Sequence, residues 1–221
     1  VTVHQNKNSY LDRYSNEKNV FYGIIEADIT DNTRLSLGHT YHQNDSNGTI
    51  WGALQLDTMA GTRNHFRRSD SSSPGWTYFN NTKNVTFAEI EHVFNNSWKI
   101  KAALTRQENN GKSKLFYNYE VADDPANNVV GGLYGLPGYF RDTEKDLIAD
   151  IYASGPFNLG GREHEVVIGT NWSRTTMDQN GLYASYYQQL LANGFNSIPG
   201  FAKPTFDSFN RFAAFDIKRW N

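Results

Sequence analysis

Carboxylate and histidine side chains are the residues of this chain that could carry catalysis. Asp123 and Asp124 are adjacent and are followed by Pro125. Two neighbouring carboxylates with no partnering base make a poor general acid and base pair, because each role needs its own reach to the reacting atom. The sequence also lacks a G-x-S-x-G nucleophile elbow and a phosphate-binding glycine loop. We therefore expect that the protein is not an enzyme.

A metal site is also not expected. The six histidines are scattered along the chain, and no cysteine is present to supply thiolates or disulfides. His39 and His42 are three residues apart, so on a strand their side chains point to opposite faces. The sequence therefore predicts neither a bound metal ion nor a resident cofactor.

Aromatic and arginine side chains gather in three stretches, near residues 45–83, 108–144 and 175–208. Tyrosine and tryptophan offer a rigid ring with a polar tip, which suits a bulky amphipathic ligand, and arginines would attract an anionic one. Simple loop packing and solvated charge are the alternatives. The candidate ligand-binding residues are Trp51, Arg67, Arg68, Trp76, Tyr78, Tyr117, Tyr134, Tyr139 and Arg141.

Within the first stretch, the run Asp70-Ser71-Ser72-Ser73-Pro74-Gly75 consists of residues that favour turns. Our hypothesis is that this run is mobile and lets the loop close over a ligand.

The segments between these stretches alternate apolar and polar residues, as β-strands do. Phe21, Ile25 and Ile29 share one face of such a strand, whereas Glu26 and Asp28 share the other. Short connections at 30–32, 95–97 and 154–156 alternate with the long stretches. The predicted strands are residues 19–29, 33–43, 84–94, 98–107, 145–153 and 163–174.

The length of these segments favours a membrane barrel. Membrane-spanning strands have about nine to eleven residues, whereas strands of soluble proteins usually have about five or six. Outer-membrane barrels also have short turns at one end and long loops at the other. A half-buried sheet in a soluble sandwich is the alternative. We expect an all-β, antiparallel transmembrane β-barrel segment, with Trp98 and Trp172 in aromatic girdles.

The polar faces of neighbouring strands carry opposite charges. Glu26 and Asp28 face Arg34, and Glu89 and Glu91 face Lys99 and Lys101. This arrangement suits a water-filled interior. No apolar run approaches the roughly 20 residues of a transmembrane helix, and the net charge of −2 gives no signature of nucleic-acid binding.

Three runs resemble the barrel of TonB-dependent ferric-siderophore receptors, in particular the ferripyoverdine and ferric coprogen (hydroxamate) group. They are SYLDRYSNEKNVFYGIIEADITDNTRLSLGHTYHQNDSNGTIWGALQL, PGWTYFNNTKNVTFAEIEHVFNNSWKIKAALTR and HEVVIGTNWSR. The likeness is strong from Ser9 to Arg174 and weaker beyond Thr175, and it rests on the order and spacing of the phrases.

The resemblance implies a barrel of about 22 antiparallel strands around an N-terminal plug domain. Residues 1–221 would supply about eight of those strands and no plug, because the chain opens and closes within alternating runs. The resemblance also implies the outer membrane of a Gram-negative bacterium, with outer-membrane lipid, a ferric siderophore and, through the plug, TonB as partners. Iron would arrive wrapped by the siderophore as transported ligand.

We therefore expect a receptor that binds a ferric siderophore through aromatic extracellular loops and imports it with energy from TonB. A passive porin or a soluble carbohydrate-binding β-protein is the alternative, because stacking aromatic rings would serve a sugar as well.

Overall fold

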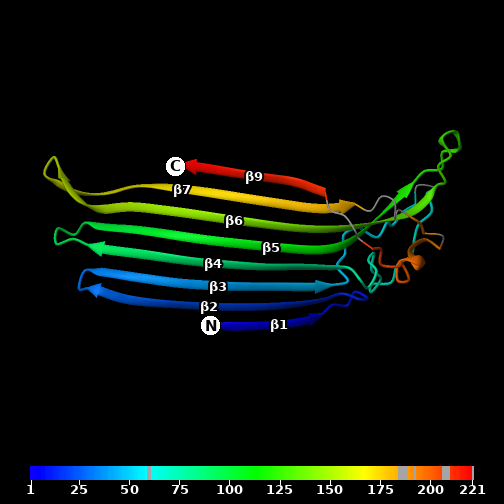
Figure 1. The fold of residues 1–221 in the computed structure, drawn as a ribbon, viewed down its shortest axis with the longest axis horizontal. Helices are drawn as coiled ribbons and strands as arrows, with labels where there is room; N and C mark the ends of the chain where they lie inside the picture. Colours follow the sequence, from blue (N-terminus) through cyan, green and yellow to red (C-terminus); the bar gives the residue numbers. More distant parts are fainter. Residues whose placement is uncertain (59–60, 184–188, 192, 206–209, 221) are drawn as a thin grey trace.

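The computed structural model describes residues 1–58, 61–183, 189–191, 193–205 and 210–220, and these form one curved antiparallel sheet (Figure 1). The strands pair in chain order, β1-β2-β3-β4-β5-β6-β7-β9, and β8 adds to β6. None of the helices in the described ranges has the length and apolar character needed to cross a bilayer. The strands are β1 (Thr2–Asn8), β2 (Ser15–Thr30), β3 (Thr33–Asn47), β4 (Tyr78–Val93), β5 (Lys99–Val121), β6 (Gly132–Leu159), β7 (Arg162–Tyr183), β8 (Gln189–Leu190) and β9 (Asn210–Trp220). The 3₁₀ turns in the described part of the chain, η1 (Pro125–Asn127) and η3 (Gly194–Ser197), lie in the connections.

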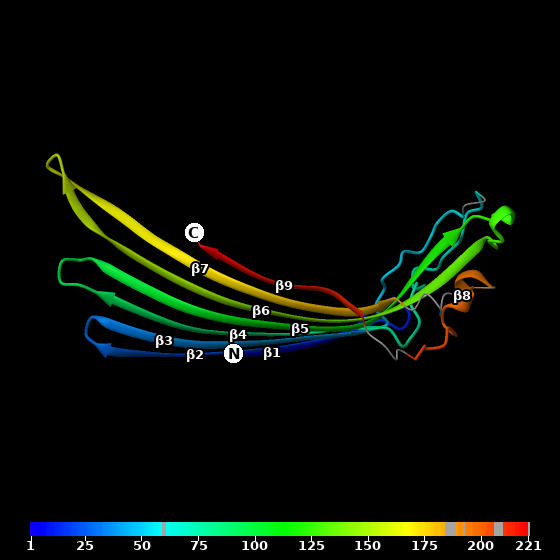
Figure 2. The same ribbon diagram turned by 45° about the horizontal axis from the view of Figure 1, so that its top comes forward.

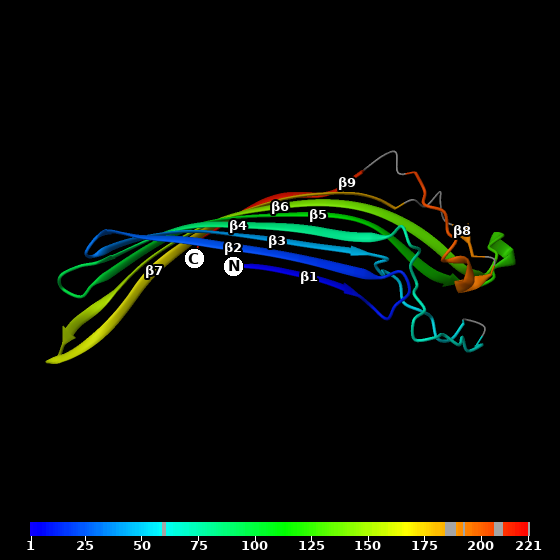
Figure 3. The same ribbon diagram turned by 90° about the horizontal axis from the view of Figure 1, so that it is seen from below.

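The sheet is a single bent layer with β1 and β9 at its two edges (Figures 2 and 3). The tight connections β2–β3, β4–β5 and β6–β7 lie together at one end, and the long connections lie at the other end (Figure 1). This is the asymmetry of an outer-membrane barrel. The structure therefore confirms the expected fold class, an antiparallel transmembrane β-barrel segment.

One face of the sheet is apolar and open to the surroundings. Because each strand pairs without a slip through this region, residues on that face line up in rows across the sheet. Ile25 is 73% exposed, Leu37 48% and Leu104 49%, so none of them is packed in a protein core. One such row is Ile25, Leu37, Ala88, Leu104, Ala149, Trp172 and Trp220.

The height of the apolar band fits a bilayer. On β6 the outward residues from Leu147 to Phe157 are Leu, Ala, Ile, Ala, Gly and Phe, and Lys145 follows above them. Ten residue steps span about 33 Å along a strand, which is about 25 Å of height at a tilt of about 40°. Trp172 and Trp220 lie on this face level with Ala149, and their ring centroids are 6.0 Å apart. The band is therefore as tall as the lipid-facing belt of a membrane barrel.

The opposite face of the same strands carries paired charges. Arg34 donates to Asp28 at 2.9 Å, Lys101 lies 2.6 Å from Glu89, and Lys99 lies 3.3 Å from Glu91. These are the cross-strand ion pairs that the alternation predicts, and they confirm which face is polar. In a barrel this face lines the interior.

The predicted turn at residues 154–156 is wrong. The strand runs through Ser154, Gly155 and Pro156, and the chain reverses at Gly160 and Gly161 instead. Both glycines have positive φ (62° and 75°), which a two-residue hairpin turn of type I′ requires. Gly155 leaves room for the ring of Trp98, which a Cβ at this position would overlap.

The strands also continue further into the predicted loops than the alternation indicates. The β3–β4 connection is 48–77 rather than 45–83, and the β5–β6 connection is 122–131 rather than 108–144. β7 runs to Tyr183 within the stretch 175–208, and residues 184–188, 192 and 206–209 of that stretch lie outside the described residues. Above the bilayer both faces of a strand meet water or loops, so the apolar and polar alternation that marks a membrane strand disappears.

The structure predicts opposite responses to a charge on the two faces. Ile151 faces outward near the middle of the apolar band, and its neighbour Tyr152 faces the interior. In the intact protein folded into phosphatidylcholine vesicles, Ile151→Arg should lower the unfolding free energy by about 2–4 kcal/mol, and Tyr152→Arg should lower it by much less. Urea titration of the two variants measures the difference. Equal losses would mean that the outward face does not contact lipid.

Candidate functional site

The β5–β6 hairpin rises beyond the rest of the sheet and carries the candidate site (Figure 2). Its register is continuous from Lys99 to Val121, so each face of the hairpin continues the face below it. Tyr117 and Tyr119 of β5 therefore extend the interior face, and Phe116 and Asn118 extend the outward face. One face of the hairpin therefore belongs to the interior side of the sheet and the other to its outward side.

Five aromatic rings form a continuous row on the interior face, which we call the aromatic wall. The rings of Tyr119 and Tyr134 are stacked across the two strands at 6.1 Å, and Tyr117 stacks on Tyr119 at 6.0 Å. Trp51, from the β3–β4 connection, meets Tyr117 and Phe140 edge to face, with ring centroids 5.7 and 5.5 Å apart. Burial, together with Tyr134, raises the pKa of Tyr119. The wall offers ring faces and hydroxyl groups to the interior.

Glycines of β6 make room for these rings. A Cβ on Gly138 would lie 2.8 Å from the Phe140 ring and 3.2 Å from Trp51. A Cβ on Gly135 would overlap the ring of Phe116 on the other face. These glycines, which look like loop residues in the sequence, are strand residues that aromatic rings cover.

Trp76 lies on the outward face of the hairpin, away from the aromatic wall. Its indole N–H donates to the carbonyl of Phe201 at 2.9 Å, and its ring meets Phe116 edge-on at 6.2 Å. Phe116 is fully buried and is the centre of a small core. The core consists of Phe116, Leu191, Ile198 and Phe201, with Trp76, Leu133 and Phe195 packed against it. These contacts give Trp76 the loop-packing role, and they fasten Leu191 and residues 193–201 to the hairpin.

Tyr78, Tyr139 and Arg141 form a second group on the outward face. Arg141 donates through two nitrogens to the hydroxyl of Tyr139, at 3.0 and 2.8 Å, and the ammonium of Lys114 lies 4.8 Å from the Tyr139 ring centre. Burial would raise the pKa of Tyr139, but the hydrogen bonds from Arg141 and the charges of Lys112, Arg141 and Lys114 outweigh it and lower that pKa. Burial and Tyr139 raise the pKa of Tyr78 to about 12.

Arg67 and Arg68 lie in the β3–β4 connection, near a third feature. Arg67 pairs with Asp70 at 2.9 Å and with Asp12 at 3.5 Å, and Arg68 lies over the ring of Tyr10 at 4.7 Å. A cavity of about 620 Å³ opens between this connection and η3. Its lining is mostly polar and includes Arg67 and Phe66, but not Arg68.

The structure therefore divides the nine candidate residues among four places: Trp76 packs against the Phe116 core, and Arg67 and Arg68 lie in the β3–β4 connection. Trp51, Tyr117 and Tyr134 meet in the aromatic wall, whereas Tyr78, Tyr139 and Arg141 gather outside it. Sequence reasoning placed Tyr119 and Phe140 in a loop but did not choose them as ligand residues. The Tyr-x-Tyr spacing of 117 and 119 is a strand signal that could have put both rings on one face. In the described ranges, no three histidine or carboxylate residues come close enough to hold a metal ion.

No protein-family model matches the chain. It is 31% identical over 212 residues to the ferric-pyoverdine BN7/BN8 receptor of Pseudomonas putida, covering 93% of this chain and 26% of that receptor. It is 34% identical over 174 residues to the ferripyoverdine receptor of Pseudomonas aeruginosa, covering 78% and 21%. A crystal structure of the Pseudomonas aeruginosa ferripyoverdine receptor bound to ferripyoverdine superposes with a TM-score of 0.76 at 28% identity, over 98% of this chain and 28% of that one. The chain thus spans about a quarter of the length of these relatives.

Replacing Trp76 should reduce the local stability of residues 193–205, to which its indole is hydrogen-bonded. Trp76→Phe keeps most of the ring but removes the hydrogen bond to Phe201, which is worth about 1 kcal/mol. Hydrogen–deuterium exchange in the intact protein should show about fivefold less protection for residues 193–205. Trp51→Phe, which changes a ring outside this core, is the matched control. Equal protection in the Trp76→Phe variant would contradict this role.

Burial of Tyr78 predicts a loss of stability at alkaline pH. The hydroxyl ionises near pH 10 in the unfolded chain and near 12 in the folded protein. Between these values the folded state holds more protons, so the unfolding free energy falls as pH rises from about 10 towards 12. Urea unfolding of the intact protein and its Tyr78→Phe variant at pH 9 to 11.5 measures this slope. The fall of the unfolding free energy with pH should be less steep in the Tyr78→Phe variant. An equal slope in both proteins would contradict the raised pKa of Tyr78.

Proposed function

Because this chain is homologous to part of the β-barrel of TonB-dependent ferripyoverdine receptors, we propose that the intact protein is an outer-membrane receptor for a ferric siderophore. It would stand in the outer membrane of a Gram-negative bacterium. Its apolar outer face would meet lipid, and its aromatic wall would meet the ligand. The aromatic wall carries the proposal, because it places five rings on the interior face above the lipid band.

The chemistry of the aromatic wall suits a siderophore that already ligates the ferric ion. Stacked tyrosines present ring faces to planar aromatic or amide groups, and their hydroxyls add hydrogen bonds at the ring edge. The ferric ion is already ligated by the siderophore, so the protein has to recognise only the outer surface of the complex. Within this proposal Trp51, Tyr117 and Tyr134 contact the ligand, and Tyr119 and Phe140 join them.

The remaining candidates have secondary roles in this proposal. Arg67 is at the cavity and Arg68 is exposed near it, where they would draw an anionic chelate towards the loops. Tyr78, Tyr139 and Arg141 face outward, so they would support the hairpin rather than touch the ligand. Import itself would depend on a plug and on energy from TonB.

The alternatives have less support. A soluble carbohydrate-binding protein would not leave a band of Ile25, Leu37 and Leu104 exposed to water. A passive porin would fit the barrel fold, but the named relatives are receptors rather than porins or enzymes.

Ligand affinity tests the proposal directly. Trp51→Ala in the intact receptor should weaken binding of ferric pyoverdine about tenfold, because it removes one ring and its edge contacts, worth about 1.4 kcal/mol. Trp76→Phe, on the outward face, should leave affinity within twofold. Fluorescence titration measures both, with ferrichrome and ferric enterobactin as comparison ligands. Binding of none of the three chelates, or equal affinity in the Trp51→Ala variant, would overturn the proposal.

A further inference from the structure

The run Asp70 to Gly75, which we hypothesised to be a mobile hinge, contains a buried tripeptide. Ser71 is 6% exposed, and Ser72 and Ser73 are fully buried. Their hydroxyls do not point to water: Ser73 donates to the carbonyl of Thr49 at 2.6 Å, and Ser72 donates to the carbonyl of Gly52. In this conformation the run is a packed part of the loop rather than an open hinge.

These two hydrogen bonds flank Trp51. Thr49 lies two residues before it and Gly52 one residue after it, so the serines fix the backbone on both sides of the indole. Asn118 of β5 donates to the carbonyl of Ser72 at 3.3 Å and ties the tripeptide to the hairpin. Close packing leaves little slack, because a Cβ on Gly52 would lie 2.7 Å from the Asn118 amide nitrogen. The tripeptide therefore connects the hairpin to the backbone that carries Trp51.

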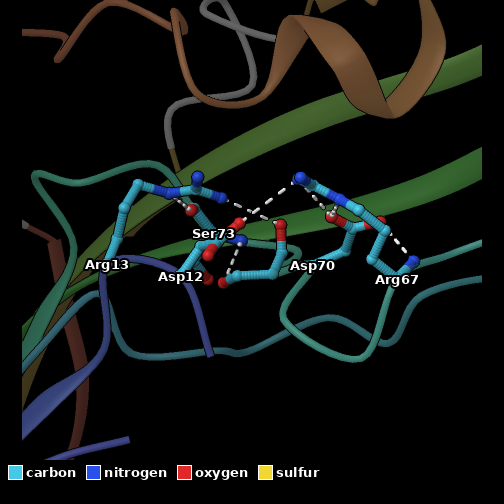
Figure 4. A network of polar contacts seen from close by, with 6 residues as sticks. Asp12, Arg13, Arg67, Asp70 and Ser73 are labelled. Atoms are coloured by element: carbon cyan, nitrogen blue, oxygen red, sulfur yellow. Dashed lines mark hydrogen bonds and ion pairs between the residues drawn. The ribbon is translucent and has the colours of Figure 1, made fainter. Parts of the chain in front are cut away.

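The tripeptide is itself held from outside the loop by Arg13. This residue lies in the short connection between β1 and β2, and it donates to the carbonyl of Ser73 at 3.0 Å and to that of Ser71 at 3.1 Å (Figure 4). One guanidinium thus bridges two carbonyls on either side of Ser72. A planar fork of N–H groups can make this bridge, whereas a lysine ammonium is a single point charge.

The backbone around Arg13 fits this role. Arg13 has a φ of 70°, in the left-handed region that a non-glycine residue seldom adopts. Gly48 packs directly against it, since a Cβ on Gly48 would overlap the Arg13 carbonyl. The amide of Gly48 donates to Thr77 at 2.8 Å, and that of Asp12 donates to Ser69 at 2.7 Å. The β1–β2 connection is therefore docked against the loop by main-chain contacts as well as by the guanidinium.

Arg67 belongs to the same polar network but makes a different kind of contact. Figure 4 shows its guanidinium turned towards Asp70, and it also pairs with Asp12. Arg67 is largely exposed, and exposed ion pairs of this kind contribute little to stability. Arg13 instead reaches buried carbonyls, so it is the stronger link between the β1–β2 connection and the loop.

We propose that Arg13 is a positioning residue for ligand recognition, which holds Trp51 in the aromatic wall through the Ser71–Ser73 tripeptide. Arg13 also lines the cavity of about 620 Å³, and in this proposal it acts through the loop rather than by contact with the ligand. It fixes the carbonyls of Ser71 and Ser73. The hydroxyls of Ser72 and Ser73 in turn fix the backbone on both sides of Trp51, so that its indole stays against Tyr117 and Phe140. The role in recognition rests on the proposed function, but the role in placing Trp51 does not.

The position of Trp51 can be tested without any ligand. In the intact receptor labelled with 5-fluorotryptophan, Trp51→Phe identifies the ¹⁹F resonance of Trp51. Arg13→Lys should shift and broaden that resonance, and Ser73→Ala should do the same with Arg13 intact. The resonances of Trp98 and Trp172, which lie in the apolar band, should not shift. Their constancy shows that the barrel is still folded. Arg63→Lys, at an exposed position in the same loop, is the matched control. A Trp51 resonance that does not move in either variant would overturn the proposal.

A double-mutant cycle tests the link to recognition. Arg13→Lys should weaken binding of ferric pyoverdine about fivefold in the parent receptor and less than twofold when Trp51 is already Ala, because Arg13 acts through Trp51. The same loss in both backgrounds would overturn that link. If Trp51→Ala does not change affinity, the proposed ligand site fails, and the ligand-free resonance still decides whether Arg13 places Trp51.

Discussion

The rest of the structure depends on one constraint: in lipid, every backbone N–H and C=O group must find a partner within the protein. The inner strands β3 to β6 meet it by pairing with a neighbour on both sides in an antiparallel ladder. Because the pairing does not slip within the bilayer region, every side chain is assigned to one of two faces. Ile25 and Leu104 then face outward, and the ion pair of Lys101 and Glu89 faces the interior. Lipid contact and a wet interior are thus consequences of one register.

The same ladder continues above the bilayer, where it becomes the framework of the candidate site. Backbone pairing between β5 and β6 holds Tyr119 opposite Tyr134 and Lys114 opposite Tyr139. Odd-numbered residues of β5 extend the interior face and build the aromatic wall. Even-numbered residues build the opposite side, where buried Phe116 packs against Leu191, Ile198 and Phe201, with Trp76 beside this core. A rigid strand, rather than a free loop, therefore positions most of the rings.

Sequence patterning predicted the membrane part of the fold well and the external part less well. The alternation around Ile25 and Leu37 and the charges of Glu89 and Lys101 identified the strands and their faces correctly. It failed at Gly155, because a glycine that makes space for Trp98 looks the same in sequence as one that makes a turn. It also failed in the β5–β6 hairpin, where tyrosines and glycines resemble a loop although they continue a strand.

The sequence by itself determined the strand faces and the antiparallel barrel class, because these follow from a two-residue period and from the alternation of short and long connections. The family likeness came separately, from the order and spacing of three sequence runs. Only the tertiary structure decided which aromatic residues stand together. Trp51 and Trp76 come from one connection, yet one ring lies on the interior face and the other in a core on the opposite face. Their separation depends on contacts with Tyr117 and Phe116, which are remote in sequence, and on buried hydrogen bonds from Ser72 and Ser73. No periodic pattern encodes such contacts, because they arise from packing in three dimensions.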